Sequence, residues 1–197
     1  MRSWVVFGVV GACALGAGVG VTVGEDKSDS RPAAEVFDFT LTDSAGKSHK
    51  LFDYKDKKAR YVVLEWTCTT CPYVKPHYEN GSMQALVKRF ADKGVVWLAI
   101  DSNKGVTAES LETWRSQHKI AHPILIDGDG AVGQKYGAKT TPHLYVLDLE
   151  TGKRIYEGAI DDNPRGSKEK VVNYVDLALT AALAGNPVET ARTKPYG

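Results

Sequence analysis

Short apolar runs recur along the chain, and each ends at polar residues or glycine. They cover residues 61–66, 95–100, 123–126, 144–148 and 154–158. In the first run Val62, Val63 and Leu64 are contiguous, which is typical of a strand covered on both faces. A turn at residues 150–153 separates the last two runs and predicts an antiparallel hairpin.

Apolar residues at helical spacing predict helices between and after these strands. We expect helices over residues 73–93, 107–118, 131–136 and 167–184. Pro76 interrupts the start of the first helix, Gly94 ends it, and Thr107 is a candidate N-cap for the second.

An alternating segment at residues 37–41, a turn at 43–47 and a returning segment at 49–52 predict a β-hairpin before the first buried strand. The full order is a hairpin, then β-α-β-α, then β, a short α, β-β and a closing α. This order predicts an α/β fold, a three-layer sandwich with a mixed β-sheet flanked by helices and an N-terminal β-hairpin.

The first residues differ from the rest. Arg2 is followed by an uncharged, Gly/Ala/Val-rich stretch at residues 4–23, which is the layout of an export signal. We interpret residues 1–24 as a signal peptide or N-terminal membrane anchor. Cleavage between residues 16 and 24 is favoured, and lipid attachment at Cys13 or retention as an anchor stay open.

The remaining sequence divides into three parts. Residues 25–35 are polar and form a linker, residues 36–185 form the domain, and residues 186–197 form a C-terminal tail. The expected location is extracytoplasmic, either periplasmic or secreted, with possible membrane attachment through the N-terminus. The net charge of +1 gives no indication of a nucleic-acid partner.

Cys68 and Cys71 form a Cys-x-x-Cys pair between the strand at 61–66 and the helix expected at 73–93. A helix N-terminus presents free N–H groups and a partial positive charge, and both favour a thiolate. The sequence has no second Cys-x-x-Cys, so it lacks the other two thiolates of a four-cysteine structural zinc site. No metal and no cofactor are expected.

After removal of residues 1–24, Cys68 and Cys71 are the only cysteines. A disulfide that closes so short a loop stabilises a fold little, because the stabilisation grows with loop length. The pair therefore indicates a redox role.

Three further blocks carry a resemblance to a known family: residues 65–75 around the cysteine pair, residues 141–146 beginning Thr141-Pro142, and residues 158–163. Together they resemble the thioredoxin superfamily, in particular the peroxiredoxin-like redoxin branch related to alkyl hydroperoxide reductase and thiol-specific antioxidant proteins. The resemblance spans roughly residues 36–197 and implies a thioredoxin-like fold. Many members of this branch carry Asn at the position of Cys68, so this chain departs from the pattern there.

The resemblance also implies roles for individual residues. Pro142 should be cis and lie against the cysteine pair, with the backbone of Thr141 available to an extended substrate chain. Trp66 should pack beside the disulfide, where it would contact substrate.

In the thioredoxin superfamily the first cysteine of the pair is normally the nucleophile and the second resolves, so the resemblance assigns attack to Cys68 and resolution to Cys71. Pro72 leaves the reverse open, because proline favours the first helical position and would make Cys71 the N-cap. Glu65 is a candidate proton relay, with a solvated or paired charge as the alternative. His77 or His143 could approach the cysteine pair, but both are interpreted as surface histidines, which is the commoner case.

The leading hypothesis is an extracytoplasmic thiol–disulfide oxidoreductase that acts on protein disulfides and uses an unknown electron donor. A thiol peroxidase is an alternative, but Cys68 and Glu65 stand where its threonine is needed, three residues before a cysteine. A copper-binding assembly factor is another, because Cys71-Pro72 with a distant His122 or His143 loosely fits a thiolate–imidazole site.

Overall fold

The computed structural model describes residues 35–197. The expected signal or anchor at 1–24 and nearly all of the linker at 25–35 lie outside the described residues. Glu35 is described, and it forms an isolated antiparallel bridge with Lys153. No helix within residues 35–197 is both long and apolar enough to span a bilayer.

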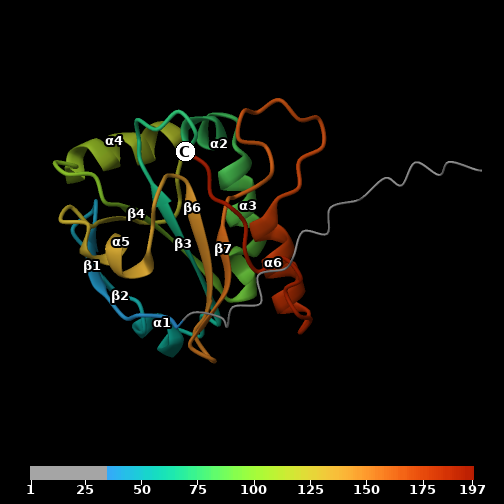
Figure 1. Cartoon of the computed structure of the whole chain (residues 1–197). Helices are drawn as coiled ribbons and strands as arrows, with labels where there is room; N and C mark the ends of the chain where they lie inside the picture. Colours follow the sequence, from blue (N-terminus) through green and yellow to red (C-terminus); the bar gives the residue numbers. More distant parts are fainter. Residues whose placement is uncertain (1–34) are drawn as a thin grey trace, which may run out of the picture.

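Seven strands and six α-helices follow one another along the described chain (Figure 1). The strands are β1 Thr40–Asp43, β2 Ser48–Lys50, β3 Tyr61–Thr67, β4 Val95–Asp101, β5 Ile124–Ile126, β6 His143–Asp148 and β7 Lys153–Gly158. The helices are α1 Asp53–Asp56, α2 Lys75–Glu79, α3 Ser82–Phe90, α4 Ala108–His118, α5 Ala131–Tyr136 and α6 Tyr174–Leu183, with a 3-10 turn at Ala91–Lys93.

All seven strands form one mixed sheet in the order β2-β1-β5-β4-β3-β6-β7. β3 pairs in parallel with β4 and antiparallel with β6, and β4 pairs in parallel with β5. Every residue of β3 is buried, as its contiguous apolar run predicts. The predicted mixed sheet and N-terminal hairpin are confirmed.

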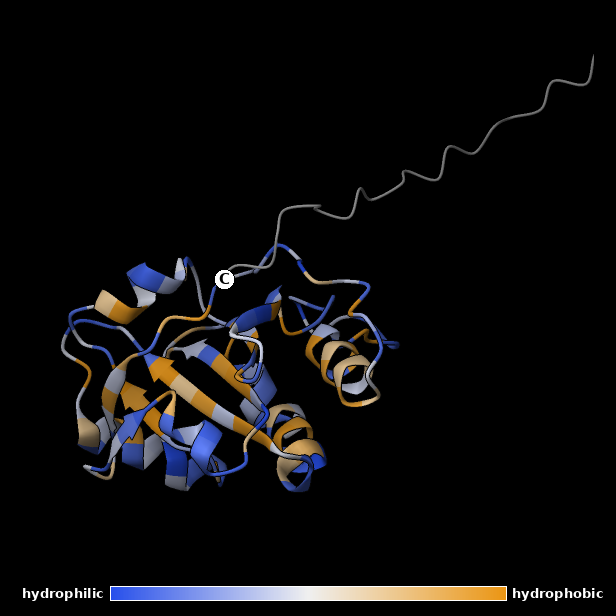
Figure 2. Ribbon diagram, turned by 90° about the horizontal axis from the view of Figure 1, so that it is seen from below, coloured by the Kyte–Doolittle hydropathy of each residue, from blue (hydrophilic) through white to orange (hydrophobic). Residues whose placement is uncertain are grey.

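Helices cover both faces of the sheet, and the strands in its middle are largely hydrophobic (Figure 2). One face packs against α2, α3, α4 and α6 through side chains such as Tyr78, Phe90, Leu111 and Leu179. The other face packs against α5 and the segments around β1 and β2 through side chains such as Tyr136, Phe39 and Leu51. The predicted three-layer sandwich is confirmed.

The helix expected over residues 73–93 is two helices, α2 and α3. Gly81 separates them in the left-handed region at φ +76°, and the side chain of Asn80 accepts a hydrogen bond from Ser82 N at 2.8 Å. The predicted apolar positions Met83 and Phe90 are still buried on α3. The break therefore comes from turn chemistry at Asn80-Gly81 and not from a change in the apolar pattern.

The closing helix α6 is also shorter than the expected range 167–184, and it begins only after Asn173. The Asn173 side chain caps it by accepting from Asp176 N at 2.8 Å. Val171 and Val172, which fall within the expected range, precede the helix and are 45% and 44% exposed.

The N-terminal hairpin lies a few residues from its expected position. Leu41 pairs with His49, and Asp43 organises the turn by accepting from Ala45 N and Lys47 N at 2.9 Å each. The charged connection expected after it contains the single turn α1.

The three sequence blocks that carry the family resemblance meet at one end of strands β3, β6 and β7. Trp66 of β3 is opposite His143 of β6, so the residues just after β3 lie beside those just before β6. Leu144 of β6 is in turn opposite Gly158, the last residue of β7. The cysteine loop, the Thr141-Pro142 loop and residues 158–163 are therefore neighbours.

Gly158 has φ +148° and lies against Thr193 of the C-terminal tail, so a Cβ at this position would overlap Thr193 Oγ1. We expect Gly158→Ala to lower the free energy of unfolding by about 2 kcal/mol through this overlap and the strained backbone. Denaturant unfolding measures the loss. Gly152→Ala is the matched control, because Gly152 also has a positive φ but has open space around its Cβ position. Equal losses in the two variants would contradict the expectation.

Candidate active site

Cys68 and Cys71 lie in the turn that follows β3, and both are free, half-buried thiols. The turn is closed by a hydrogen bond from Cys71 N to Cys68 O at 3.1 Å. Cys68 Sγ lies 3.2 Å from Thr70 Oγ1 within the exposed loop. Cys71 packs against the hydrophobic core cluster that includes Val74 and Tyr78.

The cysteine pair does not directly begin a regular helix, contrary to the expectation from sequence. α2 starts at Lys75, after Val74, and Pro76 stands in its first turn. The chain reaches it through a single turn in which Lys75 N donates to Cys71 O at 3.1 Å. Pro72 is therefore not the first helical residue, which removes the capping argument for Cys71 as the nucleophile.

The loop before β6 faces the cysteine pair. The Thr141-Pro142 peptide bond is cis, as predicted. Cys71 Sγ donates a hydrogen bond to the Thr141 carbonyl oxygen at 3.1 Å. The second cysteine thus contacts the backbone that the resemblance assigns to substrate binding.

Glu65 is completely buried on β3, three residues before Cys68. Tyr78 OH donates to its Oε1 at 2.8 Å, and Trp97 Nε1 donates to its Oε2 at 2.8 Å. His122 Nε2 lies 3.9 Å from Oε2. Tyr78 and Trp97 belong to the same core cluster against which Cys71 packs, so Glu65 and Cys71 share one face of the sheet.

Burial raises the pKa of Glu65 to about 7, although the hydrogen bonds from Trp97 and Tyr78 oppose the rise. Burial also lowers the pKa of His122 to about 3, so this imidazole is neutral near pH 7. Glu65 can therefore hold or release a proton at neutral pH. The solvated-charge alternative for Glu65 is wrong.

Trp66 lies on the opposite face of the sheet and is only 2% exposed. Its ring packs against Tyr136 and Tyr145 at centroid distances of 5.4 and 5.1 Å, and its Nε1 donates to Ser102 Oγ at 3.1 Å. This position corrects the expectation that Trp66 contacts substrate, because so buried a ring offers no surface. Its role is to pack the core beside the site.

The histidines interpreted as surface residues are buried. His143 packs on Tyr145, whose OH lies 3.1 Å from His143 Nδ1, and burial lowers its pKa to about 4. His77 on α2 faces the C-terminal tail, with Nε2 3.2 Å from Tyr196 OH. Within residues 35–197 no cluster of three metal-ligating side chains occurs.

Sequence reasoning missed several residues around the site. Tyr78, Trp97 and His122, which surround Glu65, come from α2, β4 and the loop before β5, and they carry no motif of their own. Tyr196 was assigned only to a tail. The block at 158–163 was the one sequence signal that pointed to this part of the site. Its Asp161 is the buried acceptor of the Tyr196 hydroxyl at 2.6 Å.

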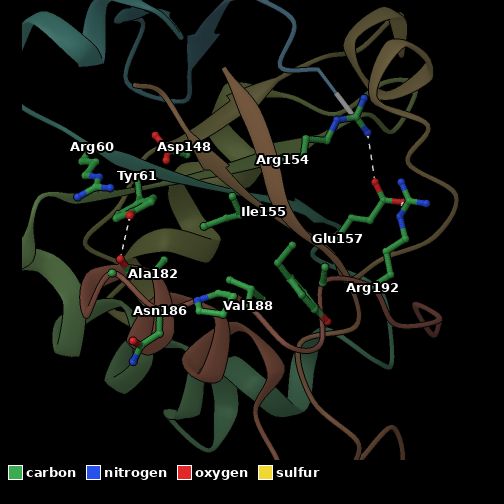
Figure 3. A pocket seen from close by; sticks show the side chains of 14 residues that line it. Arg60, Tyr61, Asp148, Arg154, Ile155, Glu157, Ala182, Asn186, Val188 and Arg192 are labelled. Carbon is green, nitrogen blue, oxygen red and sulfur yellow. Dashed lines mark hydrogen bonds and ion pairs between the residues drawn. The ribbon is translucent and has the colours of Figure 1, made fainter. Parts of the chain in front are cut away.

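A cavity of about 360 Å³ lies away from the cysteines, between β7, the end of α6 and the tail (Figure 3). Arg154, Glu157 and Arg192 line one side and form ion pairs of 3.4 and 2.9 Å. Tyr61 lines the other side and donates to Ala182 O at 3.0 Å. Neither cysteine lines this cavity.

Solved structures with the same fold come from several bacteria. A hypothetical protein from Sinorhizobium meliloti 1021 is 26% identical with a TM-score of 0.75, covering 84% of this chain and 91% of its own. An uncharacterized conserved protein from Geobacillus kaustophilus is 26% identical with a TM-score of 0.71, covering 84% and 93%. The thioredoxin domain of a thiol-disulfide oxidoreductase from Bacteroides vulgatus, 18% identical with a TM-score of 0.57 over 78% of this chain and 97% of that one, shows the shared fold.

Among curated proteins, the chain is similar to the thiol-disulfide oxidoreductase ResA of Bacillus species. The protein from Bacillus thuringiensis strain Al Hakam is 27% identical over 179 residues, which is 88% of this chain and 96% of the relative. The protein from the konkukian subspecies is 28% identical over 123 residues, which is 62% of this chain and 66% of that relative's length.

The family model of the AhpC/TSA family matches residues 32–153, more than half of the chain. The match includes the cysteine turn, Glu65 and the Thr141-Pro142 loop. It agrees with the redoxin resemblance of the sequence motifs and with the thioredoxin-like sheet. The chain belongs to the AhpC/TSA family.

Proposed function

We propose that this protein is a thiol–disulfide oxidoreductase that acts on protein disulfides through Cys68 and Cys71. The observation that carries the proposal is the different setting of the two thiols. Cys68 lies in the exposed loop beside Thr70, whereas Cys71 is bonded to the Thr141 carbonyl at 3.1 Å. In a dithiol of this kind, one sulfur attacks the substrate disulfide and the other lies beside it to resolve the mixed disulfide.

In the reducing direction, the Cys68 thiolate attacks one sulfur of a substrate disulfide. The substrate S–S bond breaks, its other sulfur leaves as a thiolate, and a mixed disulfide with Cys68 forms. Cys71 then loses its proton and attacks Cys68 Sγ, which releases the second substrate thiol and leaves a Cys68–Cys71 disulfide. The substrate gains two electrons, and a dithiol donor must return two electrons to the protein.

Glu65 is proposed as the group that receives the proton of Cys71. The support is its pKa of about 7 and its place on the sheet face against which Cys71 packs. Thr141 and Pro142 are proposed as the edge along which an extended substrate chain docks, because Thr141 already contacts Cys71 through its backbone.

The proposed location, domain bounds and substrate class rest on the sequence and its relatives and belong to the same proposal. The 1–24 pattern supports an exported protein, periplasmic or secreted, cleaved from its signal or held by it at a membrane. Residues 36–185 are the redox domain and 186–197 its tail. The similarity to ResA proteins over most of their length supports protein thiols as the substrate class.

Reduction of insulin in the presence of dithiothreitol tests this function against a thiol peroxidase. We expect insulin to precipitate faster with the protein than without it, because Cys68 is a free thiol in an exposed loop and can attack a protein disulfide. We expect hydrogen peroxide to be consumed no faster than by a Cys68→Ser/Cys71→Ser double variant. Peroxide consumption without insulin reduction would reject the oxidoreductase in favour of the peroxidase.

A further inference from the structure

The C-terminal tail runs past β7 toward the end of the sheet where β3 leads to α2 (Figure 1). It adds a short parallel segment to the edge strand β7. Glu157 N donates to Ala191 O at 3.0 Å, and Thr193 N donates to Glu157 O at 3.1 Å. Thr193 Oγ1 then accepts from Ala159 N at 2.9 Å. These contacts fix the direction of the tail toward the edge where Cys68 and Cys71 lie.

Tyr196 anchors the end of the tail beside the cysteine turn. Its hydroxyl donates to Asp161 at 2.6 Å and lies 3.2 Å from His77 Nε2, which can donate to it. Its ring lies 6.0 Å from the ring of Tyr73, two residues after Cys71. The anchor thus bridges the 158–163 block, α2 and the cysteine loop.

Gly197 then lies directly on the loop before Pro142. A Cβ built at Gly197 would overlap Thr141 O and Thr140 Oγ1, so the two backbones are in close contact. Thr141 O is the atom that accepts the hydrogen bond from Cys71. The tail therefore covers the backbone edge assigned to the substrate chain.

The contact is suited to release. Thr140 Oγ1, which Gly197 abuts, is buried without a hydrogen-bond partner among the described residues, and water could satisfy it if the tail left. Beneath residues 187–192 lies the cavity of about 360 Å³, so part of the tail bridges a hollow (Figure 3). An incompletely packed segment has fewer contacts to lose on opening.

We propose that residues 194–197 are a displaceable cover on the Thr140-Thr141 edge that restricts access of protein substrates to Cys68 and Cys71. This inference rests on the proposed function, because the covered edge is the proposed docking edge. A protein disulfide needs that edge and must displace the cover. A small disulfide needs only the half-buried Cys68 sulfur in the exposed loop and not the docking edge.

Tyr196→Ala tests the cover, because it removes the ring and both hydrogen bonds of the anchor. We expect insulin reduction to rise about tenfold, the factor that corresponds to ~1.4 kcal/mol, while reduction of a small aromatic disulfide stays unchanged. Glu189→Ala is the matched control, because Glu189 is an exposed residue of the same tail but lies outside the proposed cover. If Tyr196→Ala does not fold, Tyr196→Phe replaces it as the test. The phenylalanine variant keeps the ring and loses only the hydrogen bonds, so insulin reduction should rise by less than tenfold.

A second measurement separates this inference from the proposed function. The reduced wild-type and variant proteins are alkylated with iodoacetamide and with a maleimide carrying a large polyethylene glycol chain. Tyr196→Ala should speed labelling by the large reagent only, whether or not the protein reduces insulin. Equal labelling and equal insulin reduction in Tyr196→Ala, Tyr196→Phe and the wild type would overturn the cover. Absence of insulin reduction in all of them, with faster labelling of Tyr196→Ala, would reject the proposed function and retain the cover.

Discussion

Replacement of Cys71 by serine should leave the protein covalently attached to its substrates through Cys68. Cys68, in the exposed loop, can still attack a substrate disulfide, but no second thiol remains at Thr141 to resolve the intermediate. Insulin reduction should fall to the uncatalysed background. Non-reducing electrophoresis, with substrate disulfide supplied and no added thiol, should show mixed-disulfide bands that disappear on reduction.

Cys68→Ser is the reciprocal variant and should give neither bands nor activity, because the remaining thiol is directed into the protein. Bands formed by Cys68→Ser and not by Cys71→Ser would move the nucleophile to Cys71. Insulin reduction at the wild-type rate by both variants would reject the dithiol mechanism.

Glu65→Gln should remove a large part of the pH dependence of stability. Burial raises the folded-state pKa of Glu65 from 4.5 to about 7. The folded state therefore favours the protonated side chain. The contribution of this protonation to the free energy of unfolding is fully present below about pH 4.5 and is lost as the pH rises through about 7. A shift of this size corresponds to about 3 kcal/mol. Because glutamine stays uncharged, the variant should gain about 3 kcal/mol relative to wild type between pH 4.5 and pH 8.

Denaturant unfolding at a series of pH values, with the cysteines kept reduced, measures this difference. Glu79→Gln is the matched control, because Glu79 is exposed on α2 and the same substitution there leaves no buried carboxyl group altered. Parallel stability curves for wild type and Glu65→Gln would show that Glu65 does not titrate near neutral pH. The same variant should slow the resolving step if Glu65 takes the proton of Cys71.

The central part of the fold could be predicted from sequence because local patterns there agree with tertiary packing. The buried runs of β3 and β4 match their predicted ranges within one residue, and α5 matches fully. Thr107 caps α4 as predicted, accepting from Ser110 N at 3.1 Å. Thr141-Pro142 was placed correctly only through the family resemblance, since its sequence equally suits a trans proline.

The errors arose where one residue overrides a longer pattern or where burial depends on distant elements. Gly81 breaks a helix whose apolar spacing continues, and Asn173 starts α6 only after Val171 and Val172, which fall within the expected range of the helix. The burial of Glu65 depends on Tyr78 and Trp97, which lie 13 and 32 residues away. Tyr196 is 119 residues from its neighbour His77, and no periodicity connects them.

The pairing of the tail with β7 has a consequence for aggregation. β7 is the last strand of the sheet, and residues 191–193 occupy hydrogen-bonding groups that would otherwise form an open edge. The opposite edge, β2, has only three residues. Unpaired edge strands are templates for the addition of strands from other molecules. A shortened chain that ends before residue 191 should therefore self-associate, whereas one that ends after Thr193 should stay dispersed at the same concentration.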